Sequence, residues 1–219
     1  METSHGNVTT EMQRASARQE AATSAVEECQ RVMRVANPAL GVMSAVTFYP
    51  GFSGLEDRFT PWLHRFFRQE ILPRLVEAVH WGSEEMGREL LLCDGTILQN
   101  SSELHRNGSR KAGRLLLREG VPTGVKCLQP LQKAVVAGQA TAHLATVFGA
   151  RCGVFSIGQQ AAALSYIYLE LRTGAPDWND LQIEEKLFEA AKVIGAFFEQ
   201  KMQSTESKIA ISVRRRSHG

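Results

Sequence analysis

One long stretch of the chain carries almost no charge, and this feature constrains the fold more than any other. Between Ala134 and Leu169 the only formally charged side chain is Arg151, although 22% of the residues in the chain are charged. The most apolar part, residues 134–150, includes Gln139, Thr141, His143 and Thr146 and is therefore too polar to span a membrane. The rest of the chain is therefore expected to cover this stretch.

Apolar and small residues in both halves of the stretch recur at steps of three and four, which predicts two helices. The first series is Leu131, Val135, Gly138, Ala142, Ala145 and Phe148, and the second is Ile157, Ala161, Leu164, Tyr168 and Leu171. We predict a buried helical hairpin in which Gly138 and Ala142 let another helix approach closely. Gly149 and Gly153 flank Arg151 and suggest either an anion-binding nest or a turn between the helices, and we favour the turn.

The segments around this hairpin also favour helices. Residues 10–36 repeat small residues every seven positions, and this stripe could pack on its own domain or on a second copy of the chain. Thr60 and Pro61 begin an amphipathic helix that Pro73 should kink or divide. Residues 39–55 suggest a short strand at 42–48 or a buried loop.

Two further helices are predicted near the middle and the end of the chain. Asp94 and Gly95 predict a turn, and before it we prefer a helix at residues 83–91 over a small hairpin that pairs the segments on either side of the turn. A last long helix begins between Asp177 and Asp180. Its predicted apolar face consists of Leu181, Leu187, Ala191, Ile194, Phe198 and Met202.

These elements predict a mostly α, single-domain bundle of about six to eight helices. The length of 219 residues and the 43% hydrophobic content suit one domain with a substantial core. We expect a flexible N-terminus at residues 1–9, a helical domain at 10–203 and a basic flexible tail at 204–219.

A segregation of charge gives the main indication of function. The chain has a formal net charge of +2, but residues 106–133 carry seven Lys or Arg against one acid, and residues 205–219 carry four against one. These two segments therefore hold +6 and +3, which leaves −7 for the remainder. Such asymmetry predicts a polyanionic partner. The candidate nucleic-acid-binding residues are Arg106, Arg110, Lys111, Arg114, Arg118, Lys126, Arg214, Arg215 and Arg216.

The spacing of the arginines indicates how such a partner would bind. Arg110, Arg114 and Arg118 lie four residues apart and would form one ridge on a helix, about 6 Å apart. No aromatic residue falls within 106–133, so stacking on bases is not indicated. We therefore expect contacts to the backbone of RNA or DNA, with an anionic membrane surface as the alternative partner.

No catalytic signature stands out, and we predict a non-catalytic, self-associating structural or scaffold protein without cofactor or metal. One alternative is an adaptor with an apolar groove beside Phe66 and Phe67. A second is a small metal-dependent enzyme, for which the candidate site is Glu77, His80 and Glu84. Candidates for a nucleophile and its base are Cys93, Cys152, His105 and His143; for His143 the usual case is a hydrogen-bonded core histidine.

The expected compartment is intracellular, cytoplasmic or nuclear. Four scattered cysteines without a CxxC pair suit buried thiols in a reducing compartment. The polar N-terminus does not resemble a secretory signal.

Overall fold

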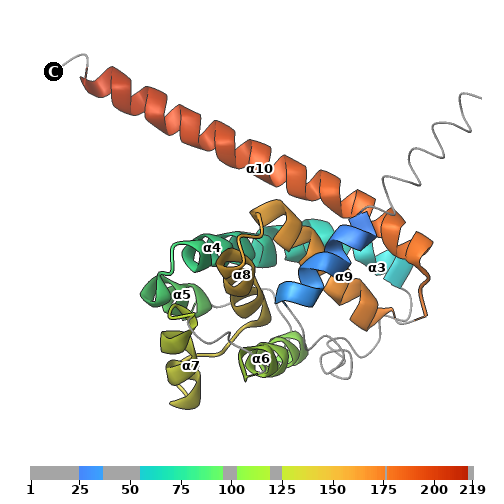
Figure 1. The fold of residues 1–219 in the computed structure, drawn as a ribbon. Helices are drawn as coiled ribbons and strands as arrows, with labels where there is room; N and C mark the ends of the chain where they lie inside the picture. The colour runs from blue at the N-terminus through green and yellow to red at the C-terminus, as the bar shows by residue number, and fades with distance from the viewer. Residues whose placement is uncertain (1–24, 37–54, 96–102, 119–124, 176, 217–219) are drawn as a thin grey trace, which may run out of the picture.

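The computed structural model describes residues 25–36, 55–95, 103–118, 125–175 and 177–216, and these residues form helices and no strand (Figure 1). The predicted mostly α bundle is thereby confirmed. A first helix covers residues 25–36. The elements that follow are α3 (Leu55–Pro61), a π-helix η1 (Trp62–Ile71), α4 (Leu72–Ser83), α5 (Gly87–Gly95), α6 (Glu103–Arg118), α7 (Leu128–Val136), α8 (Leu144–Val154), α9 (Gln159–Gly174) and α10 (Asp180–Arg216).

The helix α8 lies at the centre of the core. Ten of its eleven residues are buried, as expected for a helix that is apolar all round. It packs most extensively against α4 and also contacts α6 and α9. The predicted buried hairpin is therefore present as α8 and α9, with its turn at residues 155–158.

Glycines on α8 and α4 let the two backbones approach closely. A Cβ atom on Gly153 would lie 2.1 Å from the carbonyl oxygen of Val79, and one on Gly82 would lie 2.3 Å from that of Ala150. Real side chains cannot approach backbone atoms so closely, so both positions require glycine. The prediction that Gly149 and Gly153 belong to a turn or a nest is wrong, because both lie inside α8.

The close-packing role predicted for Gly138 is also wrong. Gly138 follows α7 in a turn with a φ of +72°, and no described atom lies within 4 Å of the position a Cβ would take. The predicted helix through 131–148 is interrupted at residues 137–143. Ala142, in contrast, is fully buried, as expected.

Pro73 divides the amphipathic helix as predicted, but the predicted helix start at Thr60 and Pro61 is wrong, because both residues lie inside α3. Proline cannot donate a backbone hydrogen bond. Just before it the chain adopts π-helical bonding, in which the N–H of Leu72 donates to the carbonyl of Phe67, five residues back. The α-helical pattern resumes in α4. The shift keeps Leu63, Phe67 and Ile71 buried on one side of η1.

The first helix packs against its own chain. Its buried residues are Val26, Cys29, Val32, Met33 and Ala36. Arg151 is also buried, and its Nε donates to the carbonyl of Ala36 at 2.5 Å. The described part of the predicted seven-residue stripe therefore packs on the domain itself. Residues 10–24 and the predicted strand or loop at 39–54 lie outside the described residues.

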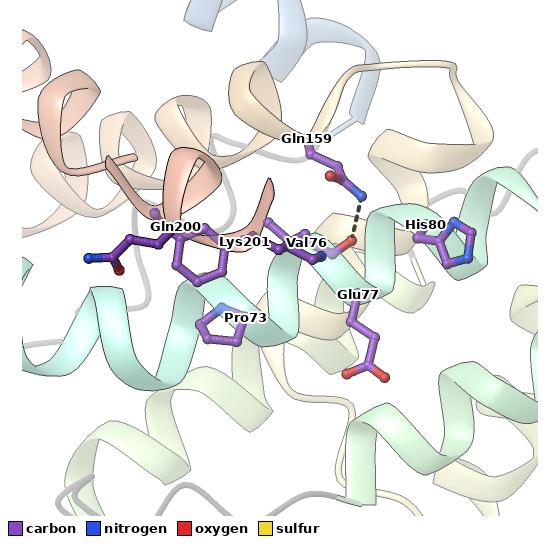
Figure 2. A pocket seen from close by; sticks show the side chains of 8 residues that line it. Pro73, Val76, Glu77, His80, Gln159, Gln200 and Lys201 are labelled. Atoms are coloured by element: carbon purple, nitrogen blue, oxygen red, sulfur yellow. Dashed lines mark hydrogen bonds between the residues drawn. The ribbon is translucent and has the colours of Figure 1, made fainter. Parts of the chain in front are cut away.

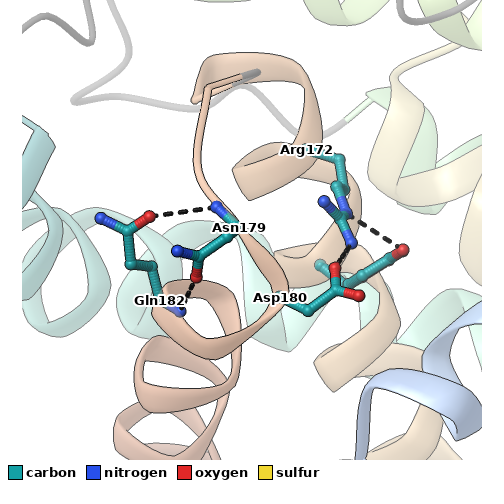
Figure 3. A network of polar contacts seen from close by, with 5 residues as sticks. Arg172, Asn179, Asp180 and Gln182 are labelled. Carbon is teal, nitrogen blue, oxygen red and sulfur yellow. Dashed lines mark hydrogen bonds and ion pairs between the residues drawn. The ribbon is translucent and has the colours of Figure 1, made fainter.

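The start of α10 is held by reciprocal side-chain contacts (Figure 3). The side chain of Asn179 accepts from the N–H of Gln182, and that of Gln182 accepts from the N–H of Asn179, both at 3.0 Å. This pairing is a capping box. Arg172 of α9 pairs with Asp180 and also donates to the hydroxyl of Tyr168. The turn between α9 and α10 is thus fixed.

The helix α10 has two apolar faces rather than the single predicted one. Leu187 and Ile194 are buried against the body, whereas Leu181 and Met202 are exposed. The helix crosses the body, and its C-terminal end extends well beyond it (Figure 1). No helix in the described ranges is both long enough and apolar enough to cross a membrane.

Candidate nucleic-acid interface

The buried face of α6 fixes the helix firmly against the core. This face comprises Ser109, Ala112, Gly113, Leu116 and Leu117. A Cβ on Gly113 would lie 1.9 Å from the carbonyl oxygen of Ala142, so α6 and the chain entering α8 are in close backbone contact. The opposite face of α6 is therefore presented in a defined orientation.

That opposite face carries the predicted cations. Arg110, Lys111, Arg114 and Arg118 are all exposed, and we call these four residues the basic ridge. Within the ranges that the structure describes, none of the four makes an ion pair or a hydrogen bond. Arg106 is half-buried and has contacts of its own. The structure thus places four of the nine candidate residues on one exposed surface.

Lys126 and residues 214–216 belong to other segments than the helix of the basic ridge. Lys126 is exposed just before α7. Residues 214–216 belong to the helical backbone at the end of α10, and their side chains lie outside the described part. That end of α10 and α6 lie on opposite sides of the body (Figure 1). The helical backbone at the end of α10 thus lies apart from the helix that carries the basic ridge.

A buried polar network anchors α6 to α8. Asp94 accepts hydrogen bonds from the N–H groups of Thr141, Ala142 and His143 at 2.7, 3.0 and 2.7 Å, and from the Thr141 hydroxyl at 2.9 Å. The hydroxyl of Ser109 accepts from the N–H of Leu144 at 3.0 Å. These bonds satisfy backbone donors that would otherwise be buried without partners at the start of α8.

His143 is the hydrogen-bonded core histidine that we expected. Its Nδ1 accepts from the N–H of Ala145 at 3.3 Å, so the proton resides on Nε2, which faces the Ser109 hydroxyl at 3.1 Å. Ser109, His143 and Asp94 resemble a catalytic triad in composition only. The Asp94 carboxylate binds backbone N–H groups rather than the imidazole ring, and Ser109 and His143 are at most 4% exposed. We infer a structural role.

The candidate thiols are unsuited to nucleophilic attack. Burial raises the pKa of Cys93 to about 12 and also raises the pKa of Cys152. Both side chains are buried, so a reactive thiolate does not form at neutral pH. The side chain of His105 lies outside the described residues. The thiol chemistry considered from the sequence therefore has no support in this geometry.

The candidate metal site falls at the edge of an open pocket (Figure 2). The pocket measures about 700 Å³ and lies between α4, the start of α9 and α10. Glu77 and His80 line it, but Glu84 does not. The Oε1 atom of Glu77 accepts from the indole of Trp81 at 3.4 Å. The described residues contain no group of three or more potential metal ligands.

Of the two phenylalanines beside which the adaptor groove was predicted, Phe67 is fully buried. The ring of Phe67 packs against those of Trp62 and Tyr166, with centroids 5.6 and 6.3 Å away. Phe66 is half-buried against the core. Phe67 therefore belongs to the hydrophobic core and cannot line an open groove, and the adaptor function stays a prediction.

The sequence reasoning missed the roles of Asp94 and Ser109, which hold the helix of the basic ridge in place. Asp94 was interpreted as a turn residue before Gly95, and no local pattern connects it with residues 141–143. No family model matches this chain, and no match was found among curated proteins or solved structures. A functional proposal therefore depends on the geometry and charge of the basic ridge.

Proposed function

We propose that this protein is a non-catalytic structural or scaffold protein that binds the phosphate backbone of a nucleic acid on the basic ridge. The observation that carries the proposal is the exposure of four cations without ion pairs among the described residues, on a helix whose other face is locked into the core. A nucleic-acid ligand also implies action inside the cell, in the cytoplasm or the nucleus.

The energetics of the ridge favour a bound anion over a purely solvated face. Like charges four residues apart on a helix repel by about 0.2–0.5 kcal/mol per pair. The only acid in α6 is Glu103, at its first residue, so the helix itself contains little to offset this repulsion. Phosphate charges recur at short intervals along a nucleic acid, and each one neutralised releases a counterion. Binding of a phosphate backbone would therefore relieve the repulsion between these cations, which the folded protein alone retains.

Changing Arg110, Arg114 and Arg118 together to glutamine tests the proposal. Glutamine has nearly the same helix propensity as arginine, so the fold should be retained. We expect the affinity for a short RNA or DNA oligonucleotide to fall by about tenfold or more, because three phosphate contacts are lost. Fluorescence anisotropy at fixed salt measures the affinity.

The matched control changes Arg34, Arg65 and Arg88 to glutamine. These three arginines are also exposed but lie on the first helix, η1 and α5. The control removes the same net charge and should bind nearly as the unchanged protein does. Equal losses in both variants would show that net charge alone drives binding. Binding to vesicles of an anionic lipid, without binding to oligonucleotides, would identify a membrane surface as the partner instead.

A further inference from the structure

The helix α10 carries apolar residues that the described part of the chain leaves uncovered. Leu181, Phe188 and Met202 are 59%, 59% and 64% exposed. Together with Gly195, these three residues recur every seven positions along the helix. Exposed Ala191 and half-buried Phe198 lie between them on the same side of the helix. We call Leu181, Phe188, Ala191, Gly195, Phe198 and Met202 the outer stripe.

The spacing of the outer stripe is typical of a helix that packs along another helix. Apolar residues at steps of three and four, repeating every seven, form the seam of paired helices. The face that contacts the body is a different one and includes Ile183, Leu187, Ala190 and Ile194. The outer stripe borders this face at Phe198, which is half-buried against the core and lies four residues after Ile194.

Gly195 has no evident packing role among the residues that the structure describes. Glycine in the middle of a helix destabilises the helix relative to alanine. No described atom lies within 4 Å of the position that a Cβ on Gly195 would occupy, so packing against the described residues does not require glycine. A second helix crossing at Gly195 would require it, as α4 and α8 require Gly82 and Gly153 at their own crossing.

The charges of α10 indicate which helix would pair with it. Residues 180–189 carry four acids and one Lys, for a net charge of −3, whereas residues 201–210, which would lie opposite them in an antiparallel pair crossing at Gly195, carry two Lys and one acid, for +1. A helix that is acidic at its start and basic at its end is complementary to a copy of itself running in the opposite direction. No other helix in the described ranges approaches the 37 residues of α10.

We propose that two copies of this chain associate through the outer stripes of their α10 helices, antiparallel and crossing at Gly195. A two-fold axis at the crossing makes every contact reciprocal. Phe188 would then pack against the partner's Met202, a favourable contact between a ring and a sulfur. Lys192, whose Nζ lies 4.5 Å from the centroid of the Phe188 ring, would face the partner's Glu199.

The first test compares two variants of the full chain by analytical ultracentrifugation over a range of concentrations. The unchanged protein should shift from the mass of one chain toward that of two. Gly195→Leu should remain folded, because its site is open and leucine favours helix. It should weaken dimerisation by about tenfold or more, since the added side chain separates the two helices. Gly95→Leu, also in open space but on α5, should leave the dimer unchanged.

The second test uses the reciprocal charge pair. Lys192→Glu should weaken the dimer, because it places a glutamate opposite the partner's Glu199. Adding Glu199→Lys in the same chain should restore it, since both pairs then regain opposite charges. The proposal would be overturned if the unchanged protein remained a single chain at all concentrations. It would also be overturned if the double variant dimerised no more tightly than Lys192→Glu alone. Oligonucleotide binding by the basic ridge is measured separately and does not depend on this result.

Discussion

Replacing Gly153 with alanine is expected to lower the free energy of unfolding by about 3 kcal/mol. The new Cβ would lie 2.1 Å from the carbonyl oxygen of Val79 and 2.6 Å from the backbone nitrogen of Ser83. Both are backbone atoms of α4, so no side chain can rotate away to make room. The two helices would have to separate along the most extensive contact in the core. Urea unfolding followed by circular dichroism measures the loss.

The control for this variant is Gly95→Ala. Gly95 lies at the end of α5 with open space around its Cβ position, so its unfolding free energy should change by no more than about 0.5 kcal/mol. If Gly153→Ala and the unchanged protein unfold at the same urea concentration, α4 and α8 do not pack as described.

Replacing Asp94 with alanine should destabilise the fold by about 3 kcal/mol or more. The Asp94 carboxylate accepts three backbone N–H groups and one hydroxyl within a buried loop, and alanine would leave these donors without partners. Each buried donor that loses its acceptor costs about 1–3 kcal/mol. Because this loop also packs against α6, the variant should loosen the support of the basic ridge.

Asp94→Asn separates the effect of hydrogen bonding from that of shape. Its amide oxygen still accepts hydrogen bonds, but its NH₂ group faces donors where the second carboxylate oxygen stood. We expect a loss of stability smaller than that of Asp94→Ala but still measurable by urea unfolding. Full stability in both variants would mean that the network does not hold the loop before α8.

The features predicted correctly from the sequence depend on local pattern. The pairing of α8 with α9 follows from apolar spacing and the missing charge, and the division at Pro73 follows from the chemistry of proline. The exposed ridge on α6 follows from arginines at four-residue steps with leucines opposite. In each case one segment holds all the required information.

The features predicted wrongly depend on a distant segment. The sequence pattern placed Gly138 in a close helix contact and Gly153 in a turn, but of the two it is Gly153 that meets another backbone, that of α4. The helix expected through 131–148 breaks because Asp94, nearly fifty residues earlier, binds the loop before α8. Leu187 and Leu181 were assigned to one face of α10, but only Leu187 meets the body.

The dependence of oligonucleotide affinity on salt tests the binding role of the basic ridge most directly. The logarithm of the binding constant should fall linearly with the logarithm of salt concentration, with a slope set by the number of phosphates contacted. In the variant with glutamine at 110, 114 and 118, that slope should shrink by up to about 3. Preference among sequences should hardly change, because backbone contacts do not read bases. An identical slope and affinity in the variant and the unchanged protein would contradict the proposed function.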